Sequence, residues 1–434
     1  MTSRDSLSFP QSAAGDVDRV STPGLGTEDQ CSAQSDVAPR FCSGYEAIKH
    51  GNDCGMSPAK RKPTSLSTKS QTCSSPARDD FTKKKKIAAI HRALRTEPVD
   101  VLTLRQLCIS RGGLLQDDLR KEAWAKLLFV DVNKIPSKPD IETLHGHADY
   151  NQVVLDVNRS LKRFPPGMET EVRLGLQDQL TDVIMWVLVS HPELHYYQGY
   201  HDICVTFLLV VGEDLTFALM DKLSVNHFRD FMDQNMNKTN HMLNYLYPIV
   251  GRASPQLQEF MIRSEVGTIF SLSWLITWYG HVLSEFPHIV RLYDFFIACH
   301  PLMPIYLAAA IVLYRESEVL ATDCEMCMVH SLLSKIPLDL PLEQLITQAG
   351  DLYVQYPPDV LESEARMHYE IAQQKYEDNR KVVAAHRALN NSRGTRNANG
   401  LLVKLTVWSL TAALSAAVLA VFRSTPQWEW LWRS

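Results

Sequence analysis

The chain has 434 residues, of which 45% are hydrophobic, enough for a sizeable core in two or three domains of ordinary size. Its net charge of −5, from 44 basic and 49 acidic side chains, provides no field of one sign that would attract nucleic acid, so no nucleic-acid partner is expected. The nine cysteines lack the short spacings of a disulfide framework. This usage favours a reducing compartment over a disulfide-stabilised secreted domain.

The N-terminal region differs in composition from the rest of the chain. It is rich in Ser, Pro, Gly, Asp and Lys, and it has too few aliphatic side chains to offset the entropy cost of ordering. We therefore predict a disordered tail over residues 1–80, without the apolar run of a signal peptide. Two basic runs, Lys60–Lys62 and Lys83–Lys86, are interpreted as solvated charge, with nuclear import or anionic-lipid binding as alternatives.

Apolar side chains recur with a helical period through the middle of the chain. One series is Leu119, Ala123, Trp124, Leu127 and Leu128. A second series lies between Leu176 and Leu188. Gly and Pro separate such runs without the regular turn spacing of sheets. The pattern predicts an all-α fold with a single large helical domain over residues 85–360.

One long apolar segment follows near the C-terminus. Residues 405–422 carry no charge and would extend about 27 Å as a helix, at roughly 1.5 Å per residue, which just crosses a hydrocarbon core. The excess of basic residues on its N-terminal side places the large N-terminal part in the cytosol. We predict a transmembrane tail anchor there, inserted after translation, with a short luminal end at 423–434. Its short length suits a thin bilayer such as that of the endoplasmic reticulum.

The segment at 361–404 is predicted to join the helical domain to this anchor. It reads as a charged helix, followed from Asn390 to Gly400 by a flexible linker that lets the domain reach partners on its own membrane. Two inner apolar stretches, 269–283 and 302–314, are short for membrane spans. We interpret both as core helices, and contact with the membrane remains the alternative.

Two polar elements in the middle of the chain carry the chemical signal. Asp156 and Arg159 share a face of a helix, so the carboxylate can hold the guanidinium extended. An ordinary surface ion pair is the alternative, and Arg163 competes as the cation. The segment Tyr196–Tyr200 predicts either a turn that presents the amide of Gln198 on an aromatic backing or simple aromatic packing. A cation and an amide suit phosphoryl transfer in a partner's site, which needs placement and charge neutralisation more than covalent chemistry.

Together these residues resemble the TBC-domain Rab GTPase-activating proteins. That family has Arg-x-x-x-Trp, Ile-x-x-Asp-x-x-Arg and Tyr-x-Gln-Gly motifs in this order. The matching residues are Arg120 and Trp124, then Asp156 and Arg159 with Val153 in the Ile place, then Tyr196, Gln198 and Gly199. Two departures are Leu115, where the family commonly has the proline of Gly-Ile-Pro, and Tyr200, where Met is common.

The resemblance implies a dual-finger mechanism on the Mg-GTP of a Rab. Arg159 would neutralise charge on the transferring phosphate, and Gln198 would orient the attacking water. The other site residues are Asp156, Tyr196 and Gly199 in supporting roles, and Arg120 and Trp124 as a partner-binding or structural motif. The chain would be a catalytic regulator of a partner GTPase, without a small-molecule substrate or cofactor of its own. Its partner would be a Rab in the GTP state, and its motif core would span residues 111–320.

The chain is similar in particular to family members anchored in the endoplasmic reticulum. This similarity implies a location in that membrane, with the catalytic domain facing the cytosol, and a role in vesicle trafficking from the endoplasmic reticulum to the Golgi, in Golgi organisation and on lipid droplets. One alternative is a membrane-tethered, non-catalytic Rab-binding scaffold, which turnover of Rab-bound GTP would distinguish. A remote alternative is an HD-type metal phosphohydrolase, suggested by His201-Asp202. Cys324, Cys327 and His330 have partial zinc spacing but lack a fourth ligand nearby, so no metal is predicted.

Overall fold

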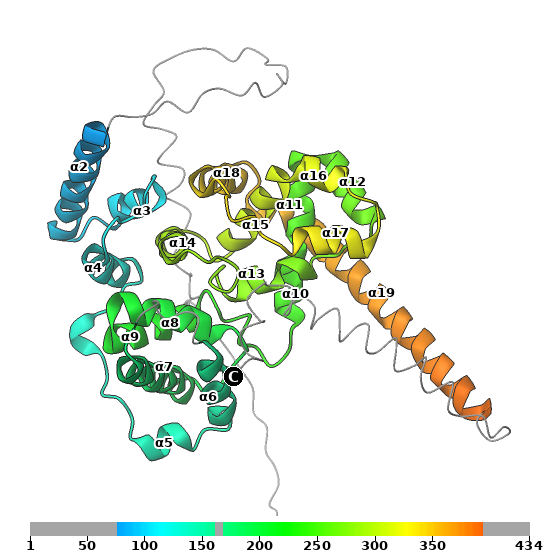
Figure 1. The fold of residues 1–434 in the computed structure, drawn as a ribbon, viewed down its shortest axis with the longest axis horizontal. Helices are drawn as coiled ribbons and strands as arrows, with labels where there is room; N and C mark the ends of the chain where they lie inside the picture. Colours follow the sequence, from blue (N-terminus) through cyan, green and yellow to red (C-terminus); the bar gives the residue numbers. More distant parts are fainter. Residues whose placement is uncertain (1–75, 161–167, 394–434) are drawn as a thin grey trace, which may run out of the picture. The chain divides into compact units, whose positions relative to one another are not determined.

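The computed structural model describes residues 76–160 and 168–393, and these residues contain no β-strand. The helices in Figure 1 confirm the predicted all-α class. The N-terminal group of helices comprises α2 (Pro76–Arg95), α3 (Val101–Ile109), α4 (Asp117–Leu127), α5 (Ile141–His145), α6 (Tyr150–Arg159), α7 (Thr170–Ser190), α8 (Tyr200–Val211) and α9 (Glu213–Val225). The C-terminal group comprises α10 (Asn237–Asn244), α11 (Leu246–Ala253), α12 (Pro255–Arg263), α13 (Leu272–Ile276), α14 (Phe286–Ala298), α15 (Met303–Tyr314), α16 (Glu316–Leu320), α17 (Met326–Leu333), α18 (Leu342–Gln355) and α19 (Pro358–Arg393). Single 3-10 turns are η1 (Val132–Lys134) and η3 (Ile269–Ser271).

Local sequence signals account for several helix ends. The side chain of Asp100 caps α3 by accepting a hydrogen bond of 2.9 Å from the backbone amide of Thr103. Proline marks other boundaries, because its ring removes the amide donor that a continuing helix needs. Such boundaries occur at Pro301 after α14, at Pro337 after α17 and at Pro358 at the start of α19.

Two helices are buried on almost every side. Every residue from Met303 to Val312 in α15 is buried, and so is every residue from Tyr200 to Leu208 in α8. A helix that is apolar all round has to be enclosed. α15 packs against α11, α13 and α18, while α8 packs against α4, α7 and α9. The stretch 302–314 is therefore a core helix, as predicted. The prediction of a core helix over 269–283 is wrong, because this stretch forms η3, the short helix α13 and a turn in which Trp278 and Tyr279 have positive φ values of 44° and 64°.

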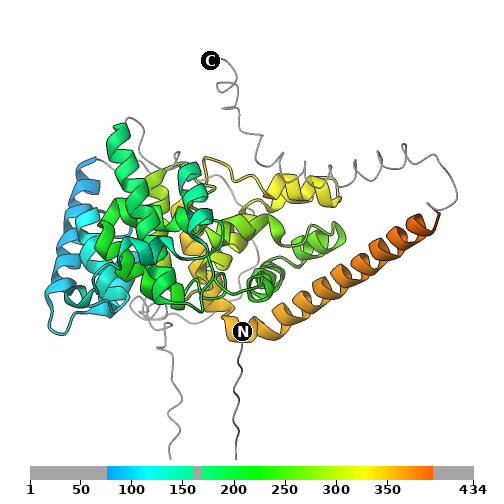
Figure 2. The ribbon, with the colours of Figure 1, turned by 90° about the horizontal axis from the view of Figure 1, so that it is seen from below.

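The two ends of the predicted organisation are only partly within the structure. No helix between residues 76 and 160 or between 168 and 393 is long and apolar enough to span a membrane. The predicted anchor at 405–422, the luminal end at 423–434 and residues 1–75 of the predicted tail lie outside the described residues. The last part of the predicted tail, residues 76–80, is instead the first part of helix α2. The predicted charged helix is α19, which packs on α10 and α11 and then projects as one long helix (Figure 2). It continues to Arg393, into the segment from Asn390 that is predicted as a flexible linker.

A buried carboxylate, Asp294, joins α14 to α4. It accepts hydrogen bonds from Arg120 Nε at 3.1 Å and Nη2 at 3.0 Å, and from Trp124 Nε1 at 2.9 Å. The backbone amide of Leu114 adds a further bond of 2.9 Å. The side chain of Asp294 is 0% exposed, so these donors compensate for the hydration that its charge loses. Arg120 and Trp124 are themselves buried beside this carboxylate.

The turn before α4 departs from the family pattern for a conformational reason. Gly113 has a φ of 57°, and a Cβ built there would lie 2.4 Å from Oδ2 of Asp294, so only glycine fits. Leu115 has a φ of 67°. Proline cannot adopt that value, because its ring fixes φ near −65°. The turn in this chain therefore excludes the proline that the family commonly has at this place.

The basic run Lys83–Lys86 is divided between surface and interior. Nζ of Lys86 donates hydrogen bonds to the carbonyl oxygens of Ser110 at 3.1 Å and Arg111 at 2.8 Å, just beyond the end of α3. Burial, with a contribution from the charge of Arg291, lowers the pKa of Lys86 to about 8. Lys86 thus binds carbonyl groups at a helix C-terminus, where a cation is favourable. The other three lysines of the run are exposed.

The burial of His227 makes the fold sensitive to acid. Its ring is 3% exposed and meets Trp278 edge-on, with 5.8 Å between the ring centroids. Burial lowers its pKa to about 3, helped by the charges of His300 and Arg105. In the unfolded chain this pKa is about 6.5, so the unfolded state binds more protons between pH 6.5 and pH 3. The free energy of unfolding therefore decreases as the pH falls through this range.

We expect His227 to account for a loss of about 2 kcal/mol between pH 7 and pH 5. Urea denaturation of the wild type and of His227→Phe at both pH values measures this contribution, because phenylalanine keeps the aromatic packing and cannot bind a proton. The variant should lose about 2 kcal/mol less than the wild type on acidification. Equal losses in both proteins would contradict the assignment.

The Asp294 cluster predicts a large effect of Arg120 on stability. Arg120→Met should lower the free energy of unfolding by about 3–5 kcal/mol, since it leaves a buried charge without its ionic partner. Asp117→Asn is the matched control, because Asp117 binds the same guanidinium at 2.7 Å but its side chain is 54% exposed. That change should cost less than about 1 kcal/mol. Similar losses in the two variants, measured by urea denaturation, would show that Asp294 does not depend on Arg120.

Candidate functional site

The second motif lies on the last turns of α6. Val153 and Val157 are buried and hold the helix against the core. The side chain of Asp156 is 1% exposed, whereas that of Arg159 is 67% exposed, and Nη1 of Arg159 lies 3.4 Å from Oδ1 of Asp156. The two residues share one face, as predicted. The pair differs from an ordinary surface ion pair because its carboxylate is enclosed and only its cation meets solvent.

Asp156 also joins the second motif to the third. Its Oδ2 accepts hydrogen bonds from Nε2 of Gln152 at 3.1 Å and from the hydroxyl of Tyr196 at 3.2 Å. Burial and the negative charge of Asp156 raise the pKa of Tyr196. The phenol therefore stays protonated and donates a hydrogen bond to Asp156. The carboxylate is thereby fixed from both sides, and it holds the loop before α8 against α6. Gln152 was not predicted, although its spacing of four residues from Asp156 is a helical signal.

A tight turn presents Gln198 to solvent. Gly199 has a φ of 118°, and a Cβ at this position would lie 3.0 Å from Cγ2 of Thr277, so both conformation and space require glycine. On the other side of Gln198, the hydroxyl of Tyr197 donates a hydrogen bond of 2.9 Å to the carbonyl oxygen of Ile276. Gln198 itself is exposed between these two fixed neighbours. The segment therefore forms a turn in which Gln198 is the exposed residue.

Aromatic packing, the other reading of this segment, is present as well. Tyr200 is 0% exposed, and its hydroxyl lies 2.6 Å from the hydroxyl of Ser224. Its ring meets those of Tyr196 and Tyr197 edge-on, at 6.5 Å and 5.7 Å between centroids. Tyr200, which stands where Met is common in the family, is thus a core residue that supports the turn from inside.

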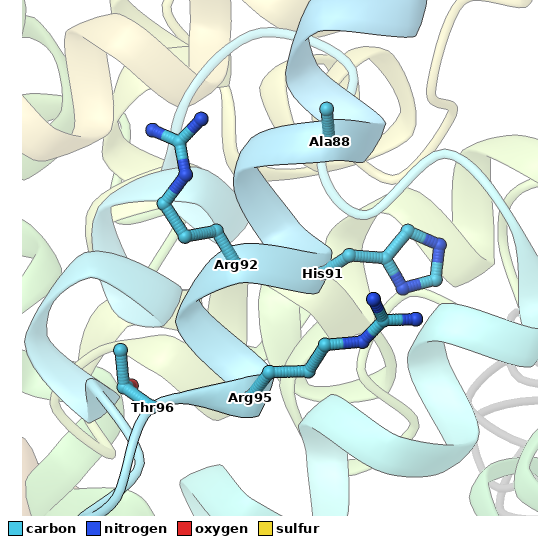
Figure 3. A pocket seen from close by; sticks show the side chains of 5 residues that line it. All are labelled: Ala88, His91, Arg92, Arg95 and Thr96. Carbon is cyan, nitrogen blue, oxygen red and sulfur yellow. The ribbon is translucent and has the colours of Figure 1, made fainter.

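Arg159 and Gln198 offer their polar groups on a surface. A pocket on α2 is lined by side chains of that helix and of the residue that follows it, and by no residue of the finger motifs (Figure 3). Its lining residues are Ala88, His91, Arg92, Arg95 and Thr96. An exposed guanidinium and an exposed amide, each held at its base, are suited to enter the active site of another protein. Arg163, the competing cation, lies outside the described residues.

The residues considered for metal binding have other contacts. Among residues 76–160 and 168–393, no group of three or more His, Cys, Asp and Glu side chains is arranged to hold a metal ion. Sγ of Cys324 lies 3.8 Å from Nη2 of Arg263, and Nδ1 of His330 lies 3.2 Å from the hydroxyl of Ser334. His201, part of the suspected metal doublet, lies against Tyr196 instead, with 3.0 Å between its Nδ1 and the hydroxyl.

Comparison with known proteins places this geometry in a family. The profile of the Rab-GTPase-TBC domain (RabGAP-TBC) matches residues 117–320, which include both motifs of the site. TBC1 domain family member 20 of Homo sapiens is 52% identical over 365 residues, covering 80% of this chain and 91% of that protein. The protein of the same name from Mus musculus is 52% identical over 367 residues, with the same coverage.

More distant proteins agree. The GTPase-activating protein gyp10 of Schizosaccharomyces pombe is 32% identical over 270 residues, covering 61% of this chain and 72% of that protein. The crystal structure of the Ypt/Rab-GAP domain of Gyp1p is similar in fold, with a TM-score of 0.51 at 15% identity, over 62% of this chain and 99% of that one. The predicted resemblance is confirmed, and the chain belongs to the Rab-GTPase-TBC domain family.

Proposed function

We propose that this protein activates GTP hydrolysis by a Rab GTPase, to which it supplies Arg159 and Gln198. The observation that carries the proposal is the buried carboxylate of Asp156, which binds both Arg159 and Tyr196. It secures an exposed guanidinium and the turn that bears an exposed amide in one small region of a TBC-family chain. The name of the S. pombe relative, a GTPase-activating protein, supports the same activity.

Arg159 stabilises charge on the transferring phosphate. Its guanidinium has five N–H donors, and Asp156 occupies only part of them, so others remain for phosphate oxygens. Because Asp156 is held by Gln152 and Tyr196 as well, it restricts the arginine before the partner arrives. Less conformational entropy is then lost when the guanidinium enters the GTPase site, and more of its binding energy is available to the transition state.

Gln198 orients the attacking water. An amide both accepts and donates hydrogen bonds, so it can hold a water through its carbonyl oxygen while its NH₂ group meets a phosphate oxygen. The left-handed conformation of Gly199 and the hydrogen bond of Tyr197 fix the backbone on each side of it. The Mg²⁺ and the nucleotide belong to the Rab, and this chain contributes positioning and charge.

The finer proposal concerns location. Residues 405–422 anchor the chain in the endoplasmic reticulum membrane, with the helical domain in the cytosol. The anchor is supported by the uncharged sequence of 405–422 and by the excess of basic residues before it. The 36-residue helix α19 precedes this segment and, at roughly 1.5 Å per residue, extends about 54 Å. Attachment to the membrane that carries the Rab raises the effective concentration of the two proteins. Rabs of the step from the endoplasmic reticulum to the Golgi, and one on lipid droplets, are the proposed partners.

The two fingers are tested by single-turnover GTP hydrolysis on a panel of purified Rabs. Arg159→Ala should lower the stimulated rate by about 10³-fold or more, the range known for arginine fingers supplied in trans, and Gln198→Ala should also abolish stimulation. Both side chains are exposed, so circular dichroism should show an unchanged fold. Arg163→Ala is the control and should have a much smaller effect. An inactive Arg163→Ala variant together with a nearly normal Arg159→Ala variant would show that Arg159 is not the arginine finger. Binding of a Rab by the wild type without stimulated hydrolysis would favour the non-catalytic scaffold.

The anchor is tested by deletion of residues 401–434. The full chain should resist carbonate extraction from membranes, whereas the shortened chain should be released by it, because the proposed membrane span at 405–422 has been removed. The shortened chain should still stimulate hydrolysis in solution, which serves as the control for folding. Continued resistance to carbonate would show that another part of the chain binds the membrane.

A further inference from the structure

A chain of buried polar side chains continues from Tyr196 beyond the two finger motifs. His201, in the first turn of α8, is 7% exposed and places Nδ1 3.0 Å from the hydroxyl of Tyr196. Its Nε2 faces Oδ2 of Asp202 at 3.9 Å. The same oxygen lies 3.2 Å from Nδ1 of His281, whose side chain is 49% exposed. This series of polar contacts therefore extends from the exposed Arg159, through buried side chains, to the exposed His281.

The number of protons decides the direction of the central bond. The phenol of Tyr196 has one proton, and the carboxylate of Asp156, 3.2 Å away, can only accept it. The phenol oxygen is then left to accept on its other side, which assigns the tautomer of His201 that carries a proton on Nδ1. If Nδ1 were instead unprotonated, the tyrosine proton would be drawn between two acceptors. Asp156 would then lose a donor in a site where it is 1% exposed.

We propose that His201 is a positioning residue for the arginine finger, acting through Tyr196 and Asp156. By donating to the phenol oxygen, His201 keeps the tyrosine proton directed at Asp156, and the carboxylate in turn keeps its orientation toward Arg159. The inference rests on the proposed Rab-GTPase activation. It assigns the His201-Asp202 pair to the finger mechanism, with Asp202 and His281 packed against the far side of the imidazole.

A matched pair of variants separates the hydrogen bond from the shape of the side chain. Asparagine can place its NH₂ group where Nδ1 of histidine lies, whereas leucine has nearly the same shape as asparagine and has no donor. His201→Leu should lower the stimulated kcat about tenfold, with KM for the GTP-loaded Rab changed less than about twofold, because one positioning hydrogen bond is lost. His201→Asn should retain kcat within about threefold of the wild type.

A second change tests whether the effect passes through the phenol. Tyr196→Phe removes the hydroxyl and should itself lower kcat about tenfold. In that background His201→Leu should have almost no further effect, because the group it acts on is gone. A purely structural histidine would lower activity equally in both backgrounds. All variants are made in the full chain and measured with the same Rab.

The outcomes are distinct. Rescue by asparagine, a change mainly in kcat and the absence of a further loss in Tyr196→Phe together support the inference. Equal activity of His201→Asn and His201→Leu, or an additive loss in the Tyr196→Phe background, would overturn it while leaving the proposed function intact. Failure of the wild type to stimulate any Rab in the panel would overturn the proposed function, and this inference with it.

Discussion

The enclosed carboxylate of Asp294 is the interaction on which the arrangement of helices depends. A charge that is 0% exposed is tolerated only where donors surround it, and here they come from Arg120, Trp124 and the amide of Leu114. These donors belong to α4 and the turn before it, whereas the carboxylate belongs to α14. Because α8 packs on α4, the same interaction also sets the helix that begins at the glutamine turn.

The site uses the same arrangement with one difference. Asp156 is almost as enclosed as Asp294, and it collects donors from its own helix, Gln152 and Arg159, and from Tyr196 in the loop before α8. All donors to Asp294 are internal, so that cluster contributes stability alone. One donor to Asp156 is the exposed side chain of Arg159. The buried carboxylate of Asp156 is held in place by the core, and it in turn orients the exposed guanidinium of Arg159 toward a partner protein.

The glutamine turn depends on a comparable division between interior and surface. Tyr200 is enclosed in the core, Tyr197 binds a backbone carbonyl, and Gly199 fits closely against Thr277. Gln198 is the member of this segment that remains exposed beside them. These neighbours limit the backbone of Gln198, whose side chain is exposed. The preorganisation of both fingers is therefore a property of neighbouring side chains rather than of the fingers themselves.

Much of this protein follows from local sequence. Helical periodicity predicts α4 and α7, proline marks the start of α19, and the spacing of Asp156 and Arg159 places them on one face, because each of these features depends on residues within a few positions. The sequence also contains the motif residues by which the family is identified. The glycine in the third motif is likewise readable, since a left-handed turn favours it.

Contacts between distant residues were decided only by the tertiary structure. No local pattern marks Asp294 as the acceptor for Trp124, since 170 positions separate them, and the burial of Arg120 and Trp124 follows from the same distant contact. In the same way, His201-Asp202 reads as a metal doublet in one dimension. In three dimensions His201 lies against Tyr196 and Asp202 lies against His281. The packing of α8 sets these contacts, and the order of residues in the sequence does not specify them.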